Sequence, residues 1–223
     1  MTGERPAYGG VRIDEFLIVF AALAEGSGLY LPGLRPLPLG VGKVAAAVAL
    51  SAWLRQMPDV RAVLLFGVAG AFPERHRGSP PPVSRGGLCV VGSDRFGDEG
   101  VETPSGFQDL NTLKLGDCGP FPANPRMAQA VAERLGAPLV RGVTVSTCSG
   151  TEARSQQLWK RCHADVETME GAAVAWVCRQ AELPLLHLRS ISNWTGDRER
   201  GGWDLAGAVE VVQAAVRKLA ATP

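Results

Sequence analysis

The chain has 223 residues, of which 46% are hydrophobic and 20% charged, a balance that suits a globular fold with a large buried core. Lys and Arg number 23 against 22 Asp and Glu, and the resulting net charge of +1 argues against a nucleic-acid partner or an acidic membrane surface. The five cysteines form no C-x-x-C pair, no signal-peptide pattern opens the chain, and no apolar run reaches the ~18 residues of a membrane span. We therefore expect a reduced, cytoplasmic protein.

Hydrophobic runs and turn residues predict strands and helices that alternate along the chain. Asn124 and Pro125 suit the N-cap and first position of one of these helices. Residues 94–124 show little periodicity, so we expect a long loop there. In chain order we expect a strand over residues 16–22, a helix over 41–55, strands over 62–66 and 88–91, a helix over 125–135, a strand over 139–146, a helix over 171–181, a strand over 185–192 and a helix over 205–220.

This alternation is typical of a three-layer α/β/α fold, in which helices cover both faces of a central mixed sheet. No internal repeat or change of composition divides the chain, so we expect a single domain over residues 1–223. Residues 1–10 are polar and contain Gly and Pro, and we expect them to form a flexible tail.

Chemistry-bearing residues follow several of the expected strands. In open α/β sheets ligands bind beyond the carboxyl ends of the strands, so these residues should meet at one cleft. They comprise carboxylates, an amide and turns of small residues, namely Glu25, residues 67–72, residues 146–151, residues 167–171 and Asn193.

The order of the elements at 40–46, 67–70, 166–173 and 188–193 resembles the nucleosidase/phosphorylase superfamily over nearly the whole chain. The V-E-x-M-E-x-A-A element, followed about twenty residues later by R-x-I-S-N, is specific to that superfamily. Further stretches are similar to futalosine hydrolases and not to methylthioadenosine nucleosidases: residues 96–107, residues 144–150, and Ser192-Asn193 with Arg198 and Trp203 downstream.

The resemblance implies a nucleoside phosphorylase-like fold and an enzyme that works without metal or cofactor. Its expected reaction is hydrolysis of the N-glycosidic bond of futalosine to release hypoxanthine, a step on a route to menaquinone. Relatives are homo-oligomers, often dimers, in which a neighbour's loop completes each site, so we expect a homo-oligomer here. The expected partner is otherwise a small-molecule nucleoside, with no nucleic acid and no membrane.

The resemblance also assigns roles to individual residues. Glu25 corresponds to the acid that activates the attacking water, and Glu170 to the acid that holds the ribose 2′- and 3′-hydroxyls. Asn193 corresponds to the position that meets the purine at N7 and its 6-substituent. Further substrate contacts are expected from Met169 beneath the sugar, from the small residues Ala69 and Gly70, from Thr147 and Thr151 of the turn after the 139–146 strand, and from Phe107 stacking on a ring.

Asn193 carries the most information about the base. Methylthioadenosine nucleosidases have Asp at this position, and a carboxylate accepts from both donors of an N7-protonated adenine. An N7-protonated hypoxanthine instead presents one donor and the acceptor O6, which an amide matches. Because a mismatched buried polar pair costs ~1–3 kcal/mol, we expect a preference for hypoxanthine over adenine.

Alternative readings stay open at this point. The Gly-rich turns carry no arginine for phosphate, which favours water over phosphorolysis, but Arg35 keeps a phosphorolytic relative in consideration. A methylthioadenosine-type or other purine nucleosidase is a further alternative, as is a nucleoside-binding protein that has lost catalysis. Arg95, Arg198 and Arg200 are equal candidates to meet the carboxylate beyond the 5′ position of futalosine, and Trp194 is a second candidate for ring stacking.

Overall fold

The computed structural model describes residues 5–198 and 202–221. Its centre is an eight-stranded mixed sheet with the order β11-β10-β6-β12-β5-β3-β4, and β9 pairs with β6. Strand β11 also pairs with β5, so part of the sheet closes on itself. The strands are β3 (Phe16–Phe20), β4 (Leu37–Pro38), β5 (Ala62–Ala71), β6 (Leu88–Asp94), β9 (Phe121–Pro122), β10 (Leu139–Thr144), β11 (Val166–Thr168) and β12 (Leu185–Trp194).

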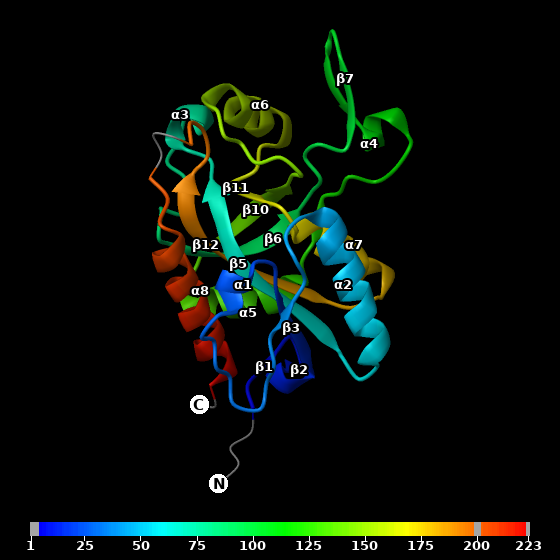
Figure 1. Cartoon of the computed structure of the whole chain (residues 1–223), viewed down its shortest axis with the longest axis vertical. Helices are drawn as coiled ribbons and strands as arrows, with labels where there is room; N and C mark the ends of the chain where they lie inside the picture. The colour runs from blue at the N-terminus through cyan, green and yellow to red at the C-terminus, as the bar shows by residue number, and fades with distance from the viewer. Residues whose placement is uncertain (1–4, 199–201, 222–223) are drawn as a thin grey trace.

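Helices cover both faces of this sheet, as the sequence predicted (Figure 1). Side chains of a strand point alternately to the two faces, and in β3 Ile18 packs with α5 (Pro125–Leu135) and α8 (Leu205–Ala220) while Val19 packs with α2 (Lys43–Gln56) and α7 (Gly171–Gln180). The three-layer α/β/α fold with a mixed sheet is therefore confirmed. Within residues 5–198 and 202–221 no helix is long and apolar enough to cross a membrane.

The start of α5 follows directly from its sequence. The side chain of Asn124 accepts a hydrogen bond from the Met127 N–H at 3.1 Å, and Pro125 occupies the first turn, where its missing N–H costs nothing. Gly136 ends the helix in the left-handed conformation with φ of 66°. Helix α8 begins in the same way, because the side chain of Asp204 accepts from the Gly207 N–H at 2.9 Å.

The expected loop over residues 94–124 is wrong in part. It contains a hairpin of β7 (Gly100–Thr103) and β8 (Gly106–Asp109), then α4 (Leu110–Leu113) and β9. The hairpin extends away from the body of the molecule (Figure 1) and packs few apolar side chains, so it shows no hydrophobic periodicity. Further elements that the sequence did not reveal are the 3-10 turn at Ile13–Glu15, α1 (Leu23–Gly26), α3 (Glu74–Arg77) and α6 (Glu152–Cys162).

Where we expected a flexible tail over residues 1–10, the structure has a β-strand that begins at Ala7. Strand β1 (Ala7–Tyr8) pairs with β2 (Val11–Arg12). Tyr8 is buried and its hydroxyl donates to the Leu219 carbonyl at 2.9 Å, which ties this segment to the end of α8. Burial of the Tyr8 ring orders a segment that we expected to be flexible because of its polar composition.

Candidate active site

A cavity lies at the carboxyl ends of the parallel strands β3, β5 and β12, beside the end of β11. This is where the sequence placed the ligand site. The residues of the cavity wall that the sequence predicted as site residues are Glu25, Ala69, Gly70, Met169, Glu170 and Asn193.

Glu25 follows β3 within the single turn of α1 and is only 3% exposed. Its Oε2 accepts from the N–H groups of Ala21 at 3.0 Å and Ala22 at 2.9 Å, and its Oε1 accepts from the N–H of Val68 at 2.8 Å. Three of the roughly four acceptor sites of a carboxylate are thus used by backbone donors. The remaining one can accept from a water molecule in the cavity.

Glu170 lies directly before α7 and faces the same cavity. Its Oε1 accepts from the Gly42 N–H at 2.9 Å. Gly42 has φ of 94°, a conformation that favours glycine, so the loop before α2 can turn its N–H toward this carboxylate. Burial raises the pKa of Glu170, while the nearby Arg189 guanidinium acts in the opposite direction.

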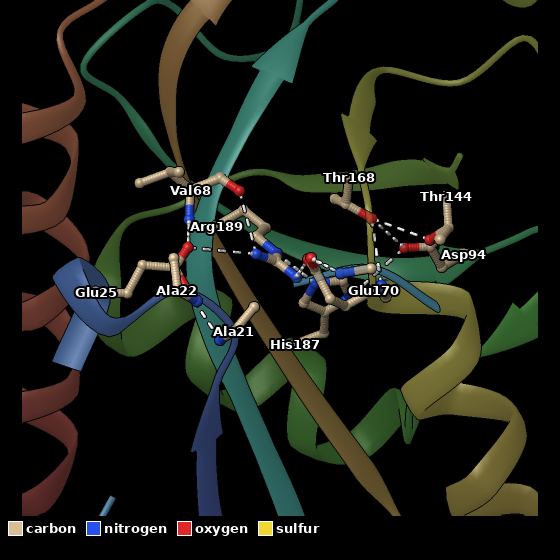
Figure 2. A network of polar contacts seen from close by, with 12 residues as sticks. Ala21, Ala22, Glu25, Val68, Asp94, Thr144, Thr168, Glu170, His187 and Arg189 are labelled. Atoms are coloured by element: carbon tan, nitrogen blue, oxygen red, sulfur yellow. Dashed lines mark hydrogen bonds and ion pairs between the residues drawn. The ribbon is translucent and has the colours of Figure 1, made fainter. Parts of the chain in front are cut away.

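Arg189 joins the two carboxylates (Figure 2). Its side chain is 1% exposed, with Nη1 3.9 Å from Glu25 Oε1 and Nη2 3.5 Å from Glu170 Oε2. Nη1 also donates to the Val68 carbonyl at 3.1 Å, and Nε donates to His187 Nε2 at 2.7 Å. A buried cation that lies between two carboxylates offsets part of their mutual repulsion.

A buried polar cluster supports Arg189 from behind. His187 accepts from Arg189, and burial together with the Arg189 charge lowers its pKa well below the usual value, so the ring is neutral. Its Nδ1 lies 3.8 Å from Asp94 Oδ2. Asp94 accepts from the Thr144 hydroxyl at 3.0 Å, and burial raises the pKa of this carboxyl to about 7. His187 is therefore a buried histidine whose Nε2 has a hydrogen-bond partner.

The amide of Asn193 is oriented by its neighbours. Its Oδ1 accepts from the Ser192 hydroxyl at 2.8 Å, and its Nδ2 donates to the Trp194 carbonyl at 3.0 Å. These two hydrogen bonds use one acceptor site of Oδ1 and one N–H of Nδ2, which leaves one N–H and one acceptor site of an amide that lines the cavity. Asn193 can therefore present a donor and an acceptor to one ligand edge.

The chain matches the phosphorylase superfamily model over residues 28–222. It is 35% identical over 205 residues to futalosine hydrolase of Thermus thermophilus, with 91% of this chain and 87% of that relative aligned. Identity to a 5'-methylthioadenosine/S-adenosylhomocysteine nucleosidase of Haemophilus influenzae is 28% over 194 residues, covering 79% and 72% of the two chains. The chain belongs to the phosphorylase superfamily and, within it, to the futalosine hydrolase family. The native structure of futalosine hydrolase of Helicobacter pylori shares the fold, with a TM-score of 0.73 at 17% identity over 92% of this chain and 96% of that one.

Among the residues predicted for this futalosine hydrolase family site, Thr147, Thr151 and Phe107 do not line the cavity. Thr151 caps α6, where its hydroxyl accepts from the Arg154 N–H. Thr147 is exposed in the loop before α6, whose Cys148, Ser149 and Gly150 line the cavity instead. Phe107 lies on the projecting hairpin, and its ring stacks on the guanidinium of Arg161 at 3.8 Å.

The structure separates the candidate cations. Arg198 lines the cavity, and its guanidinium lies 4.5 Å from the ring centre of Trp203. Arg95 instead pairs with Asp109 at 2.9 Å, and Arg35 is exposed away from the cavity wall. Arg200 lies outside the described residues.

Sequence reasoning missed the role of Arg189. A charged residue inside the apolar run of β12 was the available signal, because a buried arginine needs paired carboxylates. The sequence analysis also assigned no role to Glu167, a third buried carboxylate of the cavity wall beside Glu25 and Glu170. Cys148 also lines the cavity, and burial raises the pKa of its thiol to about 12, which disfavours a nucleophilic thiolate. Among the described residues no group of three or more His, Cys, Asp or Glu side chains is placed to hold a metal ion.

Proposed function

We propose that the chain hydrolyses the N-glycosidic bond of futalosine and releases hypoxanthine, as a step of menaquinone biosynthesis. The observation that carries this proposal is the pairing of Glu25 and Glu170 across Arg189 in one cavity that also presents the Asn193 amide. The 35% identity to a futalosine hydrolase over most of both chains supports the choice of substrate.

Cleavage of a C1′–N9 bond builds positive charge on the ribose and negative charge on the departing base. A carboxylate at the ribose hydroxyls stabilises the oxocarbenium-like sugar, and we assign this role to Glu170, with Met169 beneath the sugar. We assign Glu25 to the attacking water, because its free acceptor site and its rigid backbone anchors suit a general base. Arg189 keeps both carboxylates in place.

We assign the purine to Asn193, with Oδ1 accepting from N7–H and Nδ2 donating to O6. The Ser192 hydroxyl donates to Oδ1 and thereby fixes the amide in this orientation. An amide held this way mismatches adenine, whose N7–H and 6-amino group are both donors. This supports hypoxanthine as the leaving base.

We assign the carboxylate of the 5′-substituent to Arg198. Among the arginine candidates with described positions, it alone lines the cavity. The rings of Trp194 and Trp203, which also line it, are placed to pack against an aromatic 5′-substituent. The exposed position of Arg35 outside the cavity wall supports water over phosphate as the attacking group.

We further propose a homo-oligomer in the cytoplasm. Exposed apolar side chains on α2, including Val44 at 78% and Val48 at 65% exposure, support contact with a second copy. All five cysteines are free thiols, which suits a reducing compartment. Light scattering of the purified protein tests the oligomer.

The test of function is base release from futalosine, aminofutalosine, methylthioadenosine and inosine in phosphate-free buffer, followed by chromatography. We expect hypoxanthine from futalosine, and no acceleration when inorganic phosphate is added. Adenine released as fast as hypoxanthine would contradict the Asn193 assignment, and phosphate-dependent turnover would identify a phosphorylase. Binding of futalosine without any product would indicate a nucleoside-binding protein.

Gly67→Ala tests whether the Glu25–Arg189 geometry controls the rate. A Cβ at Gly67 would collide with Glu25 Oε1 and Arg189 Nη1, so one of them must move. We expect kcat to fall by about 10²-fold, the cost of a misplacement of about 1 Å. The matched control is Gly92→Ala on β6, where the nearest atom lies 3.7 Å from the new Cβ, and its kcat should stay near that of the parent protein. Equal rates for both variants would remove the link between this geometry and turnover.

A further inference from the structure

Glu167 is a buried carboxylate to which the mechanism above assigns no role. It lies on β11, is 6% exposed, and lines the same cavity as Glu170 and Asn193. A carboxylate buried in a cavity wall is costly unless it is paired or meets a ligand donor. Its surroundings therefore bear on what the cavity binds.

The strand register places Glu167 and Asn193 on the two sides of Gly70. Glu167 pairs with Gly70 across the antiparallel β11–β5 ladder, and Asn193 pairs with the same glycine across the parallel β5–β12 ladder. Directly opposed residues of an antiparallel pair project from the same face. Asn193 covers that face of Gly70, because a Cβ there would lie 3.3 Å from Asn193 Nδ2.

This arrangement forms a row of carboxylate, glycine and amide along one wall of the cavity. Neighbouring strands lie ~4.8 Å apart, so the backbones of Glu167 and Asn193 are separated by roughly 10 Å. A side chain at Gly70 would meet Thr195 Cγ2 at 3.0 Å and Asn193 Nδ2 at 3.3 Å, so the amide of Asn193 lies directly against this glycine. The separation suits one flat heterocycle in the cavity between the Glu167 and Asn193 side chains, with adjacent polar edges turned to the two of them.

The carboxylate of Glu167 is held as an acceptor. The Ser149 N–H donates to Oε1 at 2.9 Å, and the Ser149 hydroxyl donates to Oε2. Burial raises the pKa of Glu167, and these donors act against that rise. A carboxylate has about four acceptor sites, so about two remain for a donor in the cavity.

We propose that Glu167 accepts a hydrogen bond from N1–H of a 6-oxopurine and so determines, together with Asn193, which purine the site takes. The inference rests on the proposed function, because it fixes how the departing base lies in that cavity. A 6-oxopurine presents N7–H, O6 and N1–H in succession, and these meet Asn193 Oδ1, Asn193 Nδ2 and Glu167. Adenine instead presents the lone pair of N1 to the carboxylate, where acceptor faces acceptor.

The competing account is that Glu167 serves only to tie the 146–151 loop to the sheet through Ser149. Both accounts predict a less stable protein when Glu167 is changed. They differ in base selectivity, because a loop tie affects all purines alike. Ser149→Ala is the matched control, since it removes a hydrogen bond to Glu167 and keeps the carboxylate.

The experiment measures binding of hypoxanthine, 1-methylhypoxanthine and adenine by calorimetry to the parent protein, Glu167→Gln and Ser149→Ala. We expect Glu167→Gln to weaken hypoxanthine binding by about 10–100-fold, the range for a hydrogen bond to a charged group. Adenine should bind Glu167→Gln at least as tightly as the parent, because the new amide can donate to N1. Ser149→Ala should change hypoxanthine and adenine by the same factor.

An equal loss of both bases in Glu167→Gln would overturn the proposal and leave the loop tie. If that variant does not fold, the parent protein still decides: equal affinity for hypoxanthine and 1-methylhypoxanthine would overturn the assignment of N1–H to Glu167. Because these measurements need no turnover, they separate this inference from the hydrolysis itself. A protein that selects hypoxanthine through Glu167 yet releases no base from futalosine would contradict the proposed reaction alone.

Discussion

Glu25→Gln should lower kcat for release of hypoxanthine from futalosine by about 10²–10⁴-fold, the usual contribution of a general base. An amide cannot take the proton of the attacking water at neutral pH. It also cannot accept from all the backbone donors around it, because Ala21, Ala22 and Val68 present N–H groups to both oxygens of the present carboxylate. Whichever way the glutamine amide is turned, its NH₂ group would therefore lie opposite at least one of these backbone N–H groups, with donor facing donor.

The measurement pairs initial rates with hypoxanthine binding and thermal unfolding. Affinity for hypoxanthine should stay close to that of the parent protein, because Glu25 is assigned to water and not to the base. Glu210→Gln, the same chemical change on the exposed surface of α8, controls for the substitution itself and should leave kcat unchanged. A Glu25→Gln protein that is folded and keeps kcat within about tenfold of the parent would exclude Glu25 as the base.

The elements that the sequence predicted well have local signals. Helix α5 combines an Asn cap, a Pro in the first turn and a Gly at its end, and its observed bounds match those expected. Strands β5 and β12 were placed correctly but end later, at Ala71 and Trp194. Their last residues carry glycine and polar side chains because they form the cavity wall, so the hydrophobic pattern stops before the strand does.

The cavity residues Glu25, Glu170 and Asn193 were predicted from the resemblance together with the rule that strand ends meet at one edge. Glu167 was expected at the cleft but without a role, and Arg189 was given no role, because both roles depend on contacts between distant segments. Arg189 and Glu25 are 164 positions apart in the sequence. No local residue spacing could identify the one as the partner of the other. Glu167 gains its place from a strand register that pairs it with Gly70.

Phe107 shows the opposite error. The resemblance implied a substrate contact from Phe107, but in the structure its ring stacks on Arg161 and does not line the cavity. The hairpin that carries it projects from the molecule (Figure 1). In the homo-oligomer proposed above, such a projecting hairpin can offer side chains to a second copy of the chain, so a substrate contact from Phe107 depends on that proposal.

Arg189→Met should lower the free energy of unfolding by about 3–5 kcal/mol at neutral pH, the cost of removing one partner from a buried ion-pair group. Methionine keeps the unbranched shape of the stem, so the loss reports mainly on charge and hydrogen bonds. Glu25 and Glu170 would then face each other across the cavity wall without a cation, and His187 would lose its donor. Urea unfolding monitored by tryptophan fluorescence measures the difference.

The pH dependence distinguishes charge from packing. Burial already raises the pKa of Glu170 in the folded protein, and loss of the Arg189 charge raises it further. Between the ordinary glutamate pKa and this raised value, the folded Arg189→Met protein binds more protons than its unfolded chain, so its stability falls as pH rises through that window. The loss in free energy of unfolding of Arg189→Met relative to the parent protein should therefore be largest at neutral pH. It should shrink toward pH ~4, the ordinary pKa range of a glutamate. A deficit that is the same at both ends of this range would mean that Arg189 stabilises the fold through packing, and that the two carboxylates do not depend on its charge.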